Sequence, residues 1–174
     1  MPGPGLLAGA VAAYAGCAYV YDVLWRPHVV AKRARIDADL AGKPLLNIGA
    51  GTPGSSVRSL LLGPTLWGDV NMDINAHRYA PVGPDSVCYG DAHDIRNPET
   101  GEPYPDGFFG AVVASHVIEH VEDPDRALAE LARVAHNGAQ NVHIIVPLWW
   151  CPHTWGHPGH RWYFDKDGGK RRLW

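Results

Sequence analysis

The sequence predicts an α/β protein built on a parallel sheet of about five strands with helices on both faces. From residue 45 onward, short apolar segments of strand length alternate with helical or glycine-rich segments, which is typical of a parallel sheet covered on both faces. The chain has 174 residues, of which 46% are hydrophobic. This length suits one domain with a short appendage, and this composition allows a buried core.

The expected strands are short and lie at residues 45–48, 66–72, 86–89, 110–114 and 142–146. Residues 56–62 are expected to form a short helix after the first strand. A stronger helix follows the fourth strand, because Asp123 is a good N-cap and Pro124 suits the first helical position. Apolar residues then recur on one face of that helix: Ala127, Leu128, Leu131, Val134 and Ala135.

Residues 1–40 are expected to form an apolar helix and a linker, and residues 41–174 a single domain. Residues 5–21 are uncharged, and Asp22 interrupts the apolar run; a run of about 17 residues is near the lower limit for a bilayer span. Two interpretations stay open. One is a membrane anchor with the domain on the cytoplasmic side. The other is a helix packed on the domain or on a protein partner, in a soluble cytoplasmic chain.

The charge balance argues against nucleic-acid binding. Lys and Arg total 15 against 18 Asp and Glu, for a net charge of -3, whereas nucleic-acid-binding domains usually carry a concentrated basic surface. The three cysteines are far apart and odd in number. A disulfide framework is therefore not expected, and a reducing compartment fits the sequence.

Three polar or glycine-rich segments follow expected strands. Gly49-Ala50-Gly51 allows a tight bend and close approach of a ligand to the backbone. Asp73 ends the second strand a little over 20 residues later, where a carboxylate can accept hydrogen bonds from ribose hydroxyls. Asp91 and Ala92 follow the third strand, and this carboxylate, or the nearby Asp94, can accept a hydrogen bond from an exocyclic amine.

The fourth strand runs into Ser115-His116-Val-Ile-Glu-His-Val-Glu-Asp-Pro124. With the three preceding motifs, this stretch resembles the class I S-adenosylmethionine-dependent methyltransferases, and most of all their small-molecule, type 11-like branch. The resemblance covers residues 45–147 and implies a Rossmann-like domain, S-adenosylmethionine as the cofactor and a small-molecule or lipid acceptor. It implies cofactor contacts, position by position, for Asn47, Gly49, Ala50, Gly51, Asp73, Ile74, Asp91, Ala92, Ser115 and His116.

The chain departs from the family pattern in two places. Asn47 stands where the family usually has Asp or Glu, which removes a charge near the amino-acid end of the cofactor. The sequence also leaves little chain after the fifth strand. Most of the usual C-terminal antiparallel hairpin is therefore expected to be missing, with residues 148–174 covering the sheet edge in another way.

Histidines and aromatic residues are dense in residues 147–164, a segment expected to lie over the cofactor site or to replace the missing strands. His116, His120 and His160 are the candidate catalytic bases. The spacing His116-x-x-Glu119-His120 also matches some zinc peptidases, but the segment precedes the start of a helix, so no metal site is predicted there. A metal site at Cys151, His153, His157 and His160 has no family pattern behind it either.

The sequence therefore predicts a methyltransferase of unknown acceptor. The alternative is a non-catalytic Rossmann-like module in a membrane-associated or larger assembly. A nicotinamide oxidoreductase shares the glycine bend and the acidic strand end, but it lacks a counterpart to residues 115–124.

Overall fold

The computed structural model describes residues 4–52, 63–78, 80–165 and 169–173. A five-stranded parallel sheet with the order β3-β2-β1-β4-β5 forms its centre. Its strands are β1 (Leu45–Ile48), β2 (Val70–Asp73), β3 (Cys88–Tyr89), β4 (Ala111–Ser115) and β5 (Val142–Ile145). The predicted α/β class and parallel sheet are confirmed, whereas the helix expected at residues 56–62 lies outside the described residues.

The second and third strands are shorter than the sequence suggested. Residues 63–67 form an extended loop that ends in a bend at Gly68. A Cβ atom at Gly68 would lie 2.4 Å from the carbonyl oxygen of Val70 and 2.9 Å from the amide nitrogen of Asn47. The loop therefore passes so close to the sheet backbone that only glycine fits, and pairing starts at Val70.

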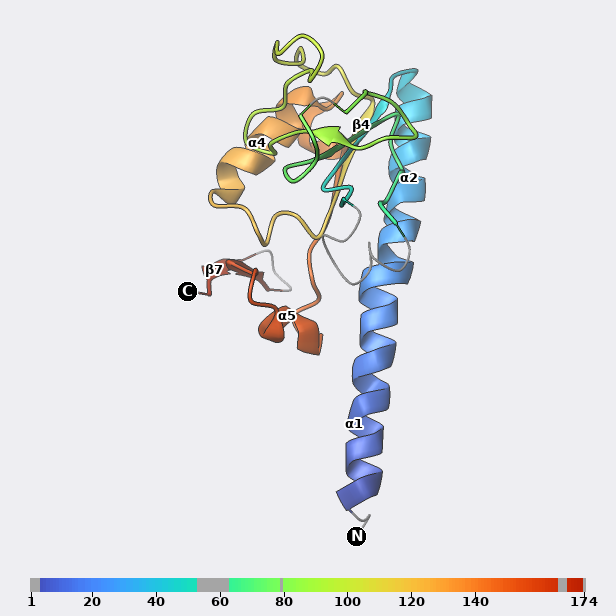
Figure 1. Cartoon of the computed structure of the whole chain (residues 1–174), viewed down its shortest axis with the longest axis vertical. Helices are drawn as coiled ribbons and strands as arrows, with labels where there is room; N and C mark the ends of the chain where they lie inside the picture. The colour runs from blue at the N-terminus through green and yellow to red at the C-terminus, as the bar shows by residue number, and fades with distance from the viewer. Residues whose placement is uncertain (1–3, 53–62, 79, 166–168, 174) are drawn as a thin grey trace.

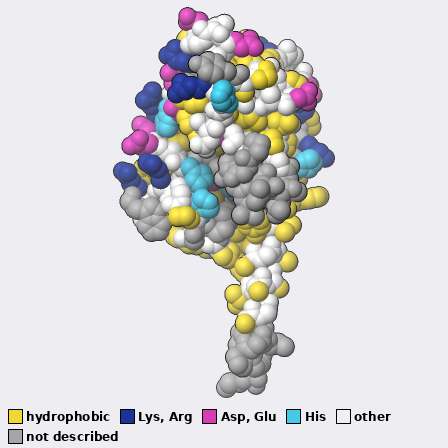
Figure 2. All heavy atoms as spheres, in the orientation of Figure 1, with side chains coloured by type: hydrophobic (Ala, Val, Ile, Leu, Met, Phe, Trp, Pro, Cys, Tyr) yellow, Lys and Arg dark blue, Asp and Glu magenta, His cyan; other side chains and the backbone are white. Residues whose placement is uncertain are grey.

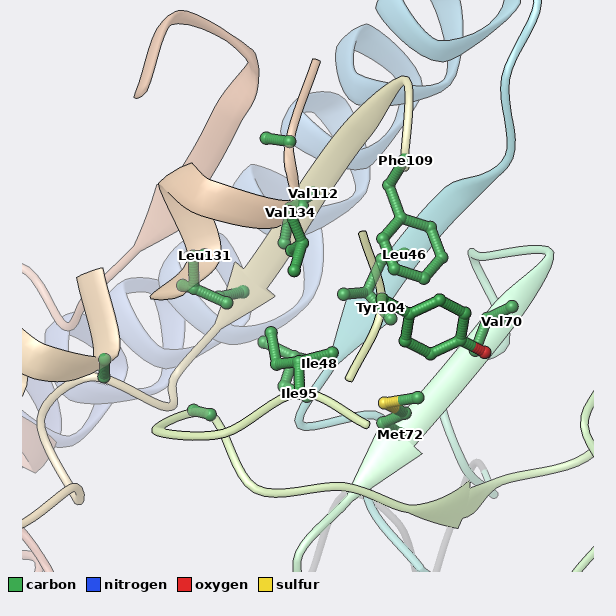
Figure 3. Packing of buried hydrophobic residues seen from close by; sticks show 14 of the residues in the cluster. Leu46, Ile48, Val70, Met72, Ile95, Tyr104, Phe109, Val112, Leu131 and Val134 are labelled. Carbon is green, nitrogen blue, oxygen red and sulfur yellow. The ribbon is translucent and has the colours of Figure 1, made fainter. Parts of the chain in front are cut away.

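The two faces of the sheet bury alternate residues of each strand, as strand geometry requires. On one face, Leu46, Ile48 and Val112 pack with α4 (Pro124–Val134), which contributes Leu131 and Val134 (Figure 3). Leu45, Ala111 and Val113 face the opposite way, toward α2 (Arg26–Ala41), where they meet small side chains. Those side chains are Ala31, Ala34 and Ala38.

The helix cap predicted before α4 is present. The Asp123 side chain accepts hydrogen bonds from the backbone N–H groups of Asp125 and Arg126, each at 3.1 Å. Pro124 occupies the first turn, and the expected apolar face is buried except at Leu128, which is partly buried. The sequence alone was sufficient to predict this helix and its cap, because capping and amphipathicity both depend on residues near one another in the chain.

The N-terminal region forms one continuous helical rod. It consists of α1 (Pro4–Tyr19), a π-helical segment η1 (Val20–Trp25) and α2 (Figure 1). Asp22 was expected to interrupt the apolar run, but it lies within the rod and is fully buried. Its carboxylate pairs with Arg26 at 2.7 Å and accepts the N–H of Leu148 at 3.0 Å, while Arg26 donates to the carbonyl of Val146. This charged pair fixes the rod to the chain that follows β5.

The expected linker is thus a helix that covers one face of the sheet. Further toward the N-terminus, α1 extends away from the domain (Figure 1) and carries yellow and white atoms without Lys, Arg, Asp or Glu on its described part (Figure 2). No helix within the described residues is long and apolar enough to cross a membrane. The part of the rod that packs on the sheet is α2.

The last described residues form a short antiparallel hairpin. After α5 (Pro152–Gly156), strands β6 (Trp162–Phe164) and β7 (Lys170–Arg172) pair antiparallel. They form a separate two-stranded sheet and do not extend the main one. Within the described residues, β5 is therefore an edge strand, and Ile144 on it is 37% exposed.

Glu130 of α4 holds the loop that follows β3. One carboxylate oxygen accepts the N–H of Ile95 at 2.8 Å, and both oxygens accept from Arg133, whose guanidinium also donates to the carbonyl of Tyr104 at 2.6 Å. Burial opposes ionisation, but the Arg133 and Ile95 donors outweigh it and lower the pKa of Glu130.

We expect Glu130→Ala to lower the free energy of unfolding by about 2 kcal/mol at neutral pH, because it leaves the Ile95 N–H without its acceptor. A group with a lowered pKa contributes stability above its unfolded pKa and loses it as pH falls through the folded value. The difference between wild type and variant in urea unfolding should therefore shrink in acid. A difference that stays constant with pH would contradict this account.

Candidate functional site

The carboxyl ends of the strands meet at one edge of the sheet. Ile48 is in register with both Met72 and Ala114, and Asp73 with Tyr89. The strand order reverses between β1 and β4. This reversal is the position at which open α/β sheets bind ligands, so the segments following these four strands define the candidate site.

The glycine bend and the acidic strand end lie against each other. Gly49 and Gly51 have φ angles of 75° and 77°, a region that favours glycine. The N–H groups of Gly49 and Ala50 donate to the carbonyl of Met72 at 2.7 and 3.0 Å, and the N–H of Gly51 donates to Oδ2 of Asp73 at 2.9 Å. The adjacency expected from the spacing is therefore present, on a single side of the sheet.

The surface beyond Asp73 is open. Its other carboxylate oxygen accepts the N–H of Asn75 at 2.8 Å, and the next side chain, Ile74, is 52% exposed. A shallow pocket of about 350 Å³ opens beside this turn, with Thr52, Asn75 and His77 in its lining. An apolar side chain and a pocket next to the Asp73 carboxylate are compatible with a flat aromatic ligand.

Asp91 is held by its neighbour. Its Oδ1 atom accepts from the backbone N–H of His93 at 2.9 Å and lies 2.8 Å from the Nδ1 atom of the same residue. Burial raises the pKa of Asp91, but these two contacts outweigh it and hold the pKa below its ordinary value. Asp94 instead pairs with Arg96 at 2.8 Å. Of the two carboxylates, Asp91 is the one at the tip of β3, followed by the buried Ala92.

The segment after β4 is strained and partly buried. His116, which follows Ser115 at the end of the strand, has a φ angle of 55°, and its backbone N–H donates to Ile145 at 2.8 Å. Its ring lies between two acidic residues: Nδ1 is 3.2 Å from Oε1 of Glu119, and Nε2 is 3.3 Å from the carbonyl oxygen of Asp22. Burial opposes protonation of this ring, but Glu119 outweighs it, so the pKa of His116 is raised.

His120 and His160 were predicted separately, and the structure brings them together with His157. The ring centroids are 4.9 Å apart for His120 and His160, 5.3 Å for His120 and His157, and 4.6 Å for His157 and His160. We call these three residues the histidine cluster. Its nearest carboxylate belongs to Glu119, with Oε1 at 4.0 Å from Nε2 of His120.

The residues 116–120 do not form a helix, as expected, so the zinc-peptidase geometry is absent there. Cys151 is buried beneath α5, outside the histidine cluster, and the side chain of His153 lies outside the described residues. In the sequence, His157 was named only as one of four residues of a possible metal site. Its only signal was its spacing of three from His160, which means little until the fold brings His120 alongside.

The sequence profile of a family described as "Methyltransferase domain" matches residues 46–142 of the chain, which is more than half of it. The chain belongs to the class I S-adenosylmethionine-dependent methyltransferases. The match begins within β1 and ends at the first residue of β5, so it contains β2, β3 and β4 and all four strand ends described above.

Two further proteins resemble this methyltransferase chain. A segment of 54 residues is 44% identical to ajmaline N-methyltransferase of Rauvolfia serpentina, and the match covers 31% of this chain but only 16% of that enzyme. One chain of a solved complex between the Haloferax volcanii Trm112 methyltransferase activator and a methyltransferase is 19% identical. That match covers 68% of this chain and 55% of the other, with a TM-score of 0.33.

The departure of this methyltransferase from its family at Asn47 has a structural reason. The side chain is 1% exposed, and its Nδ2 atom donates to the carbonyl oxygen of Thr65 at 2.5 Å and to Oδ1 of Asn71 at 3.1 Å. Asn71 in turn accepts the N–H of Gly68 at 2.9 Å. Both partners of Asn47 are acceptors, so this position requires a donor that an ionised carboxylate does not have.

Proposed function

We propose that the chain is an S-adenosylmethionine-dependent methyltransferase and that the cofactor binds across the Gly49–Gly51 bend and Asp73. The observation that supports this most directly is the 2.9 Å hydrogen bond between the Gly51 N–H and Asp73. This hydrogen bond connects the glycine bend, whose backbone a ligand can approach, to a carboxylate that can accept hydrogen bonds from two ribose hydroxyls. Both lie at the end of the sheet where such ligands bind. When bound, the cofactor would supply a methyl group already activated by a sulfonium.

The other strand ends would complete the binding surface. Ile74 would pack against the adenine, and Asp91 and Ala92 would meet its edge. Ala50, Ser115 and His116 would border the part of the cofactor nearer the sulfur. Asn47 would act indirectly, by fixing β1 and the loop at Thr65, because its amide is used within the fold. The chain would then mainly align donor and acceptor and exclude water.

The acceptor is proposed to be a small molecule or a lipid. A methyl acceptor that must lose a proton needs a general base, and His116, His120 and His160 are the candidates. His116 pairs with Glu119 at 3.2 Å, and this contact raises the pKa of its ring against the effect of burial.

We expect the purified full chain to bind S-adenosylmethionine in isothermal titration calorimetry, and Asp73→Asn to weaken binding by roughly 100-fold. Hydrogen bonds to a charged acceptor contribute about 1.5–3 kcal/mol, and the neutral amide weakens two of them. Asp39→Asn is the matched control, because Asp39 lies on the exposed side of α2.

A folded wild-type sample without binding, checked by circular dichroism, would favour the non-catalytic Rossmann-like module. Equal binding by wild type and Asp73→Asn would show that the cofactor does not lie at this bend. Methyl transfer to a panel of small amines, alcohols and lipids would then be measured with radiolabelled cofactor.

A further inference from the structure

Three imidazoles from two separate segments converge at the histidine cluster. Each of the rings of His120, His157 and His160 offers one nitrogen, and these three nitrogens all lie within 4.8 Å of one another. We propose that these residues bind a divalent transition-metal ion of the zinc class, which connects the turn after β4 to the chain after α5. This proposal does not depend on the binding of S-adenosylmethionine.

The backbone prepares two of the rings for metal binding. Nδ1 of His120 lies 2.8 Å from the carbonyl oxygen of Gly159, and Nδ1 of His160 lies 2.9 Å from that of Thr154. A carbonyl oxygen only accepts, so each Nδ1 carries a proton and Nε2 of the neutral ring holds the lone pair. Metal-binding histidines almost always have their second nitrogen fixed in this way.

His157 is the adaptable member. The Gly159 N–H donates to its Nδ1 atom at 3.1 Å in an exposed contact. A metal bound at Nδ1 would replace this contact at little cost, because water can serve the Gly159 N–H instead. Three nitrogens bound to one zinc ion at about 2.0–2.1 Å lie roughly 3.3 Å apart. The nitrogens of the cluster lie within 4.8 Å of one another, so the rings need to approach by at most about 1.5 Å.

A buried negative charge lies next to the cluster. The side chain of Glu119 is 1% exposed, and neither of its oxygens has a hydrogen-bond partner of good geometry in the described part of the chain. Its Oε1 atom lies 3.2 Å from Nδ1 of His116 and 4.0 Å from Nε2 of His120. Burying a carboxylate is costly; His116 offsets part of that cost, and a divalent cation beside His120 would offset more of it.

A histidine binds a metal ion through the neutral imidazole, which is the form that the backbone contacts of His120 and His160 favour. Three imidazoles with one remaining position suit zinc, and imidazole also binds copper and nickel. A bound ion would occupy His120 and His160, which leaves His116 among the three candidate bases.

The test uses the full chain without an affinity tag, stripped with EDTA and dialysed. We expect one Zn²⁺ per chain by calorimetry and by elemental analysis after desalting, and Co²⁺ should give the intense visible absorption of a tetrahedral site. His157→Ala should weaken Zn²⁺ binding by more than about 100-fold, since even second-shell changes cost about 10–100-fold. His28→Ala is the control, because His28 is exposed on α2.

His157 is exposed and lies outside the hydrophobic core, so its substitution should leave folding intact. Zinc should also raise the melting temperature of the wild type and of His28→Ala, but not that of His157→Ala. The proposal is overturned if the stripped wild type takes up no stoichiometric zinc, or if His157→Ala binds it as tightly as the wild type does.

Discussion

Changing Asn47 to aspartate, which with glutamate is the residue that the family resemblance implies here, is expected to destabilise the protein by about 3 kcal/mol, the range seen when a buried charge loses its partner. The new carboxylate would face the carbonyl oxygen of Thr65 and the Oδ1 atom of Asn71, which both accept hydrogen bonds. Restoring the family residue should therefore not improve cofactor binding. Urea unfolding of Asn47→Asp measures the first effect and cofactor titration of the folded variant the second.

Asn97→Asp provides the matched control. The Oδ1 atom of Asn97 accepts the backbone N–H of Glu99 at 2.9 Å in an exposed turn, and a carboxylate can accept the same bond. The identical chemical change should alter stability there by no more than about 0.5 kcal/mol. Equal effects at the two positions would mean that the donor requirement at Asn47 is wrong.

The pH dependence gives an independent check on the same variant. Burial without a donor should raise the pKa of the introduced carboxyl above its unfolded value. The folded state then binds the proton more tightly, so the stability lost relative to wild type should be largest at neutral pH and should shrink as the pH falls through the raised pKa. Protonation would also supply an O–H donor for Thr65.

Local patterns in the sequence predicted most of the fold. The cap at Asp123, the stripe on α4 and the apolar strands β1, β4 and β5 all depend on residues near one another in the chain. The adjacency of the glycine bend and Asp73 followed from the parallel sheet itself, since consecutive strand ends share an edge. These features required no knowledge of distant contacts.

Long-range pairing determined the features that the sequence did not reveal. In the sequence, Asp22 interrupts an apolar run. In the structure it is buried, where it pairs with Arg26 and accepts a hydrogen bond from the Leu148 N–H. The roles of Asn47 and His157 depend in the same way on Thr65 and His120, which are distant in sequence. A residue type alone cannot indicate such a partner.

Replacing Gly49 with alanine is expected to cost about 3–4 kcal/mol of unfolding free energy. Two causes add. The φ angle of 75° is unfavourable for a residue with a Cβ atom, at about 1–2 kcal/mol. A Cβ atom would also lie 2.1 Å from Cγ2 of Val117, and relieving such an overlap costs about 1–3 kcal/mol. Thermal and urea unfolding should both report the loss.

Gly42→Ala separates the two causes. Gly42 has a φ angle of 62°, but nothing lies within 4 Å of a Cβ atom there, so this variant should show only the backbone cost. Adding Val117→Ala to Gly49→Ala should recover the steric part, with a coupling of at least about 1 kcal/mol in the double-mutant cycle. Additive effects would indicate that the bend and the segment after β4 are not in contact. The coupling also bears on the function, because the contact of Val117 with Gly49 joins the strand ends on either side of the topological reversal where the cofactor is proposed to bind.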